Sequence, residues 1–202
     1  MRVAVISAAV SLTVAGLGFW FTYYNTRRLN QRQDRLTRVN QQLSQLYGPM
    51  LTLTATSDAA WRAYVNKYGQ GIVGLVRNTP QSVTDQDEWM SWVRVVLMPL
   101  NRRLFEKIVQ GGDLLIGSDM PRVLLAFSAH VVSWEATIAR WDRGQRDELN
   151  AAIDHPGRDL YRYAETCYNE LKELQGVLLE AKIRGAVNRG LSISNDTHLP
   201  GS

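Results

Sequence analysis

The chain is poor in the residues that build metal, redox and acid–base centres. It has 202 residues and a single cysteine, Cys167, so neither an internal disulfide nor a cysteine-based metal cluster can form. The three histidines occur without the Glu-x-x-His pairs of di-iron bundles. Zinc-protease, Walker A and Gly-x-Ser-x-Gly motifs are also missing. We therefore expect no cofactor, no metal and no enzymatic activity, and an enzyme with an unfamiliar site is the least favoured alternative.

Charge is absent from one long stretch, which runs from Val3 to Thr26. A helix of this length spans about 36 Å, and the hydrocarbon core of a bilayer is about 30 Å thick. Aromatic residues gather at its C-terminal end, as in an interfacial belt. The apolar run continues past the small residues where a signal peptide would be cleaved, so cleavage is disfavoured. The sequence predicts a retained transmembrane anchor over residues 1–26.

Five arginines follow within twelve residues, at positions 27, 28, 32, 35 and 38. So basic a flank resists translocation, which predicts a single-pass protein of the inner (cytoplasmic) membrane whose C-terminal domain lies in the cytoplasm. Residues 47–202 carry a net charge of −1, so the basic balance belongs to the flank and nucleic acid is not an expected partner. The residues expected to hold the anchor at the lipid surface are Trp20, Tyr23, Tyr24, Arg27 and Arg28.

The basic juxtamembrane helix, residues 27–46, carries an a/d pattern. Leu29, Leu36 and Leu43 are seven residues apart, and Val39 and Leu46 repeat at the complementary position. The favoured interpretation is that this stripe packs on the protein's own bundle. Homodimerisation through the stripe is the alternative, although little more than two heptads is short for an independent coiled coil.

No run alternates with period two for long enough to predict a sheet, and the remaining patterns are helical. After a bend at Tyr47-Gly48-Pro49, helices are expected over 49–68, over 85–110 with a kink at Pro99, and over 158–187. Another begins at Ser118 or Asp119. Its apolar stripe is the clearest in the chain and consists of Leu124, Phe127, Val131, Trp134, Ile138 and Trp141.

These patterns predict an all-α protein. An N-terminal transmembrane helix (1–26) continues into the juxtamembrane helix (27–46), an antiparallel helical bundle (47–187) follows, and a disordered tail (188–202) ends the chain. Expected local features are a capping box of Asp85 and Glu88 and an apolar face of the last helix that includes Leu174 and Leu178. The stretch 69–74 matches G-x-G-x-x-G, but without a preceding strand it does not indicate a dinucleotide site.

Two short motifs carry a resemblance. Leu46-Tyr47-Gly48-Pro49 follows a glutamine-rich helix, and Ala129-His130-Val131 precedes Trp141. Over about residues 36–180 the chain resembles a group of uncharacterised bacterial single-pass membrane proteins with an LYGP motif and an AHV…W helical region. Family members have Gly-Asp after the tryptophan, where this chain has Gly144-Gln145. The resemblance implies one N-terminal membrane helix and a helical remainder, and it brings no activity.

Four residues are candidates for a partner surface or a pocket: Trp89, Trp92, His130 and Trp134. The two tryptophans at 89 and 92 lie beside acidic residues and would anchor a partner if exposed. His130 is expected to be buried and hydrogen-bonded to a neighbouring helix, while His155, in a loop, is expected to be solvated. The leading hypothesis is a membrane-tethered, non-catalytic interaction or accessory module with a protein partner at the membrane. The alternative is a ligand sensor that signals through residues 25–46.

Overall fold

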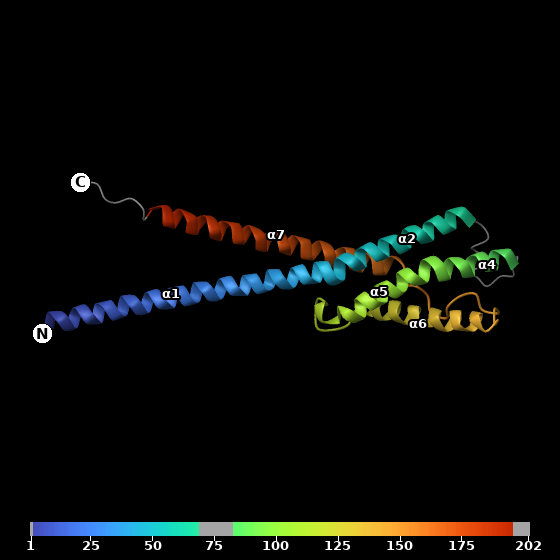
Figure 1. Ribbon diagram of the computed structural model, residues 1–202, viewed down its shortest axis with the longest axis horizontal. Coiled ribbons are helices and arrows are strands. Elements are labelled where there is room, and N and C mark those ends of the chain that lie inside the picture. Colours follow the sequence, from blue (N-terminus) through green and yellow to red (C-terminus); the bar gives the residue numbers. More distant parts are fainter. Residues whose placement is uncertain (1, 69–82, 196–202) are drawn as a thin grey trace. The chain divides into compact units, whose positions relative to one another are not determined.

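The computed structural model describes the backbone of residues 2–68 and 83–195, and the side chains of residues 17–68, 86–180 and 183. Every regular element in these ranges is helical, which confirms the predicted all-α class (Figure 1). The elements are α1 (Arg2–Gln41), η1 (Gln42–Tyr47), α2 (Gly48–Tyr68), α4 (Val83–Trp92), η2 (Val93–Leu97), α5 (Met98–Gln110), η3 (Gly112–Leu114), α6 (Arg122–Asp142) and α7 (Arg158–Asn195). The G-x-G-x-x-G stretch and the side chain of Asp85 lie outside the described residues.

The chain divides into two compact units. One consists of residues 1–40 with residues 174–202, and the other of residues 41–173. In the first unit the amide of Gln175 donates a hydrogen bond to Oδ1 of Asn40, with 2.7 Å between the two atoms. Within the part of the chain that the structure describes, none of the helices has an apolar stretch sufficient to traverse a bilayer.

The second unit is a helical bundle in which α2 contacts α5 and α5 contacts α6. Its largest fully buried side chains come from η1, α2, η2, α5, α6 and the first half of α7. The stripe predicted for α6 is buried at all six positions, and Leu160, Ala164, Cys167 and Leu171 are the buried residues of α7. Leu174, which was expected to continue that face, is instead 46% exposed. A buried apolar stripe on each helix is what holds such a bundle together.

At Tyr47-Gly48-Pro49, where a bend between two helices was expected, the backbone stays helical from α1 through η1 into α2. Residues 42–47 form a π-helical turn, and the N–H of Gly48 donates to the carbonyl of Leu43, five residues earlier. The proline ring would clash with the carbonyl four residues before it in a regular helix, and a π turn relieves that clash. Gly48 itself has no Cβ to collide with the ring that follows it.

The same solution recurs at the second helical proline. The π-helical turn η2 ends at Leu97. The N–H of Met98, the residue before Pro99, donates to the carbonyl of Val93. The sequence predicted a kink at Pro99, and the structure places the irregularity in the turn that precedes it. Each proline therefore lies in the first turn of a new α-helical segment, where its missing N–H removes no α-helical bond.

Two helix ends differ from expectation. Helix α6 begins at Arg122 with Pro121 as its N-cap residue and no side-chain cap, so the predicted caps at Ser118 and Asp119 are wrong. The fixed φ of Pro121, −60°, already suits a helix start. Helix α7 continues to Asn195, past the expected end at Val187 and through part of the stretch expected to be a disordered tail. Extending a formed helix costs less than nucleating one, which favours this continuation.

The α5 helix ends as predicted, at Gln110, where Gly111 is the C-cap residue. A Cβ on Gly111 would lie 2.9 Å from Cδ1 of the buried Leu46. Glycine therefore lets the end of α5 approach η1 closely. This approach joins η1 to the end of α5.

Candidate functional sites at the arginine collar and in the aromatic core

The first candidate site is the arginine collar, by which we mean residues 20–35 of α1. The aromatic side chains at its start are exposed: Trp20 is 67% exposed, Tyr23 57% and Tyr24 56%. Leu17, Phe19 and Phe21 are exposed beside them. Exposed apolar residues at this density are typical of a surface that contacts lipid or another protein.

Three of the collar arginines have no acidic partner among the described residues. Arg27, Arg32 and Arg35 form no ion pair with any residue that the structure describes, and Arg28 lies over the ring of Tyr24, with 5.6 Å from Cζ to the ring centroid. Guanidinium groups without a protein anion are available to anions from outside the chain. The predicted anchor residues thus combine exposed rings with available positive charge.

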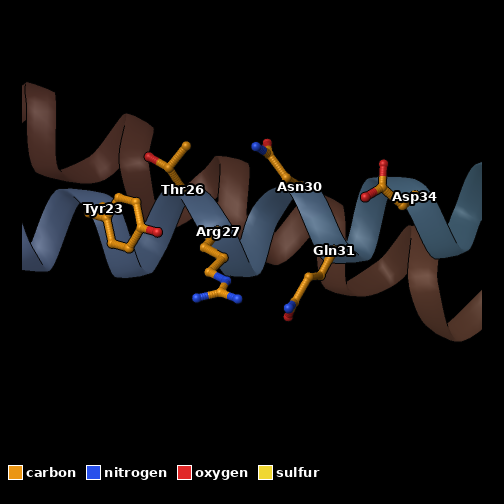
Figure 2. A pocket seen from close by; sticks show the side chains of 6 residues that line it. All are labelled: Tyr23, Thr26, Arg27, Asn30, Gln31 and Asp34. Atoms are coloured by element: carbon orange, nitrogen blue, oxygen red, sulfur yellow. The ribbon is translucent and has the colours of Figure 1, made fainter.

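A shallow hollow of about 440 Å³ lies on the same stretch of α1 (Figure 2). The described residues that line it are Tyr23, Thr26, Arg27, Asn30, Gln31 and Asp34. They repeat at steps of three and four residues, so they share one face of the helix. Their hydroxyl, amide and guanidinium groups make this face polar. The aromatic end of the collar thus gives way to a polar face within three helical turns.

The second candidate site is the aromatic core of the bundle. Ring contacts connect residues from α2, α4, α6 and the segment 143–157 in a continuous series. Trp89 contacts Tyr64 at 5.4 Å and Trp134 at 6.1 Å between ring centroids, and Trp134 contacts Trp141 at 5.8 Å. The two edge-to-face pairs, Trp89–Trp134 and Trp134–Trp141, each add about 0.5–1.5 kcal/mol to simple burial. The predicted candidates Trp89 and Trp134 are therefore structural parts of the core.

Trp89 is not the exposed anchor that the sequence analysis considered. It is only 4% exposed, and its indole Nε1 donates a 2.8 Å hydrogen bond to the carbonyl oxygen of Leu149. Its neighbour Trp92 is half-buried, and the buried indole N–H of Trp92 has no hydrogen-bond partner among the residues that the structure describes. An unpaired buried donor costs about 1–3 kcal/mol, so the two tryptophans contribute to stability in different ways.

His130 is buried, as expected, but its partner is a loop and not a helix. Its Nδ1 lies 2.7 Å from the carbonyl oxygen of Ile153, so Nδ1 is the protonated nitrogen. Its ring contacts Trp134 and His155 at 6.2 and 4.9 Å between centroids. Burial lowers the pKa of His130, and the Ile153 carbonyl and the Asp154 carboxylate oppose that effect.

His155 retains exposed surface, in keeping with the expected solvation, yet its ring lies against Phe127 and His130. Its Nδ1 accepts a 2.8 Å hydrogen bond from the N–H of Gly157, whose φ of +57° favours glycine. Partial burial, and then the nearby His130, lower the pKa of His155. Sequence reasoning missed this histidine pair, because the two residues are 25 positions apart and meet only in the fold.

The segment 143–157 is held against α6 at several points. Oγ of Ser133 accepts hydrogen bonds from the N–H groups of Ala152 and Ile153, and Nε1 of Trp141 donates to the carbonyl of Glu148. Arg140 forms ion pairs with Asp147 and Glu148 at 2.8 and 2.7 Å. The segment therefore covers the aromatic core as an ordered part of the fold. Among the described residues, no group of three or more His, Cys, Asp or Glu side chains is placed to bind a metal ion.

A buried polar contact at η1 was also missed. Oη of Tyr47 accepts a 3.0 Å hydrogen bond from the N–H of Ile116 and lies 3.3 Å from Oη of Tyr163. Burial raises the pKa values of both phenols and of the neighbouring Cys167 thiol. A thiol that burial keeps protonated is a poor nucleophile, and Cys167 is a buried residue of the core.

Comparison of the chain with protein-family models, with curated proteins and with solved structures finds no match.

Proposed function

We propose that this protein is a membrane-tethered helical interaction module, a non-catalytic subunit or scaffold of an assembly at the inner (cytoplasmic) membrane. The first 26 residues anchor it in a single pass, and residues 27–46 carry the chain into the cytoplasm. The helical body binds a protein partner in or at the membrane, or a second copy of the chain. The resemblance to single-pass bacterial proteins with an LYGP motif is part of the same proposal.

One observation carries the proposal. An uncharged segment of 24 residues continues, within the single helix α1, into a collar of exposed aromatic rings and arginines. Arg27, Arg32 and Arg35 of this collar form no ion pair with a residue that the structure describes. Water solvates exposed Phe19 and Trp20 poorly, whereas a bilayer interface accommodates aromatic rings, with arginines at the headgroups. Along this one helix an uncharged segment is followed by aromatic residues and then by arginines, which is the order expected where a helix leaves a membrane.

The body fits an antiparallel bundle. Two ion pairs connect α6 with the helical stretch that contains η2 and α5: Arg94 with Asp142, and Arg102 with Glu135. From the first pair to the second, the residue number rises from 94 to 102 on one stretch and falls from 142 to 135 on α6. The two pairs therefore support antiparallel directions for the two helical stretches. An accessory module of this kind needs a rigid body, and a bundle provides one.

Exposed aliphatic residues on this pair of helical stretches support a partner surface. Val95 and Val109 are 71% and 63% exposed, and Leu125 and Val132 on α6 are 55% and 59% exposed. Residues fourteen or seven apart lie on the same face of a helix. Arg102 and Glu135, which are paired to each other, lie within the same stretches. Apolar residues around a satisfied ion pair are a plausible composition for a recognition surface.

The experiment is purification of the full chain from membranes in mild detergent. We expect the tagged protein to remain in the membrane pellet after alkaline extraction, and a reporter fused after Ser202 to be active in the cytoplasm. A defined partner should co-purify in constant ratio. Val132→Asp should abolish co-purification of the partner and leave the protein in the membrane. Ser118→Asp, in the exposed loop before α6, should leave both the partner and the membrane attachment in place. Release of the protein from the membrane at alkaline pH would refute the anchor. A protein that migrates as a monodisperse monomer under every condition would refute the interaction role.

The second candidate, a ligand sensor that signals through the juxtamembrane helix, is favoured by one specific feature. The helical backbone is unbroken from Arg2 to Tyr68, through the π turn that ends beside Gly48. π-helical turns occur frequently at functional sites. A ligand-induced change in hydrogen exchange at residues 42–47, observed with a small molecule that co-purifies, would support sensing over scaffolding.

A further inference from the structure

The residues just before α7, which we call the strap (residues 150–157), lie against α6 and all retain exposed surface. Oγ of Ser133 accepts hydrogen bonds from the N–H groups of Ala152 and Ile153, at 2.9 and 3.3 Å. Nδ1 of His130 lies 2.7 Å from the carbonyl oxygen of Ile153, whose side chain is 42% exposed. Segments with few buried apolar contacts open first in a folded protein, so attachment of the strap depends on these polar groups.

The residues on either side of the strap are fixed by contacts that do not depend on pH. Before the strap, Leu149 is 6% exposed, and its carbonyl oxygen accepts the 2.8 Å hydrogen bond from Nε1 of Trp89. After the strap, Leu160 in the first turn of α7 is 0% exposed. Neither an indole N–H nor a backbone carbonyl titrates between about pH 4 and about pH 7. The strap therefore lies between two attachments that persist when the pH falls through this range.

The two histidines at the strap respond differently to a proton. Nδ1 of His155 accepts a 2.8 Å hydrogen bond from the N–H of Gly157, and an acceptor nitrogen needs a free lone pair. A proton on Nδ1 removes that lone pair and sets two N–H groups against each other. Nδ1 of His130 instead donates to the Ile153 carbonyl, so protonation of its other ring nitrogen leaves this bond intact. His155 is therefore the histidine whose hydrogen bond requires the neutral ring.

The surroundings of the pair do not compensate a charge on His155. The two rings stand edge to face with 4.9 Å between their centroids, so a positive charge on one opposes a positive charge on the other. Burial, and then His130, lower the pKa of His155. Among the described residues, Asp154 is the carboxylate that acts on the pair, and it raises the pKa of His130 against the larger effect of burial. At the start of α7, Asp159 is paired with Arg162 at 3.6 Å.

We propose that the strap is a pH-dependent cover of α6: protonation of His155 detaches residues 150–157, while the rest of the bundle stays folded. The exposed surface of His155 gives protons access to its ring in the closed state. When the strap opens, Phe127 loses its ring contact with His155, and His130 loses the Ile153 carbonyl. Phe127 and His130 are 0% and 6% exposed in the closed state, so acid uncovers a ring surface on α6. This second state goes beyond the proposed function and does not depend on the membrane anchor.

The test is hydrogen exchange of the detergent-solubilised full chain at about pH 7.5 and about pH 5, with each rate divided by the intrinsic rate at that pH. The reporters are the amides of Ala152, Ile153 and Gly157, whose N–H groups are hydrogen-bonded in the closed strap. The pKa of His155 is about 4 in the closed strap and about 6.5 for a free ring, so the more acidic condition should favour opening about 30-fold. Amides of α6 should keep their protection at both pH values.

Three substitutions separate His155 from the carboxylates that titrate in acid. His155→Asn offers an amide oxygen to the Gly157 N–H and does not titrate, so its strap should stay protected at both pH values. His155→Lys removes the acceptor and carries a permanent charge, so its strap should be open at both pH values. Asp154→Asn, the matched control, removes only the neighbouring carboxylate and should keep the acid-induced opening.

A wild-type strap that stays protected in acid refutes the proposal. A loss of protection that persists in His155→Asn also refutes it, because another group is then the trigger. If the strap and α6 lose protection together, acid unfolds the whole body and the strap is not a separate cover. Each of these outcomes leaves the anchor untouched, because membrane retention is measured separately.

Discussion

Replacing Gly48 with alanine should destabilise the protein, although the same change stabilises most helices. Gly48 is helical, with φ of −65° and ψ of −53°, so alanine is compatible with its backbone angles. A Cβ at this position, however, would lie 2.5 Å from the carbonyl oxygen of Leu43, the acceptor of the π-turn hydrogen bond. Because the neighbouring atom belongs to the backbone, the turn itself must shift.

The expected magnitude follows from three contributions. Loss of the Gly48–Leu43 hydrogen bond costs about 1 kcal/mol, and overpacking against the Leu43 backbone costs about 1–3 kcal/mol. The higher helix propensity of alanine stabilises the folded state by about 1 kcal/mol and offsets part of this loss. The net expectation is a loss of about 2 kcal/mol, which corresponds to a melting temperature lower by roughly 4–8 °C for a chain of this size.

The measurement is thermal unfolding of the detergent-solubilised full chain. Helix content is followed by circular dichroism at about 222 nm. Gly176→Ala is the matched control, because Gly176 is an exposed glycine in α7 with open space where its Cβ would lie. The control should leave stability unchanged or raise it by up to about 1 kcal/mol. If Gly48→Ala were as stable as the control, the steric argument for the LYGP turn would be wrong.

Two further predictions concern the aromatic core. In urea unfolding, Trp89→Phe should cost about 1–3 kcal/mol more than Trp92→Phe, because only the Trp89 indole N–H has a hydrogen-bond partner; equal losses would show that the bond contributes nothing. Stability should also fall as the pH drops below about 6.5, since the folded-state pKa values of His130 and His155 are lowered and the unfolded chain then binds more protons. Above that pH the contribution is fully present. His155→Asn, whose amide oxygen can replace the Nδ1 acceptor, should flatten the acid limb of the profile, and an unchanged limb would exclude His155 as its source.

The periodic parts of the sequence predicted the structure well where one face of a helix had to be buried. The six-residue stripe of α6 is apolar at steps of three and four, and each of its residues is buried. Leu43 and Leu46 are also buried, at 8% and 0% exposure, in agreement with packing on the protein's own bundle. Homodimerisation through the rest of the juxtamembrane stripe stays a prediction.

The errors fall at prolines and helix ends. Proline was taken to bend the chain at position 49, but a helix can absorb proline through a π turn when the preceding hydrogen bonds rearrange. Pro121 was expected inside the first turn of a helix capped by Ser118 or Asp119, and it proved to be the cap residue. Such choices depend on small local differences in energy, which hydrophobic periodicity does not report.

The sequence by itself determined the helical class, because hydrophobic periodicity acts between residues three and four apart and needs no long-range information. It also determined where charge is absent and where it is concentrated, which is the basis of the proposed anchor. Only the tertiary structure decided that Trp89 is buried and bonded to Leu149, that His130 meets His155, and that α7 leaves the core near residue 174. These outcomes depend on contacts between residues far apart in the chain, which local patterns cannot encode.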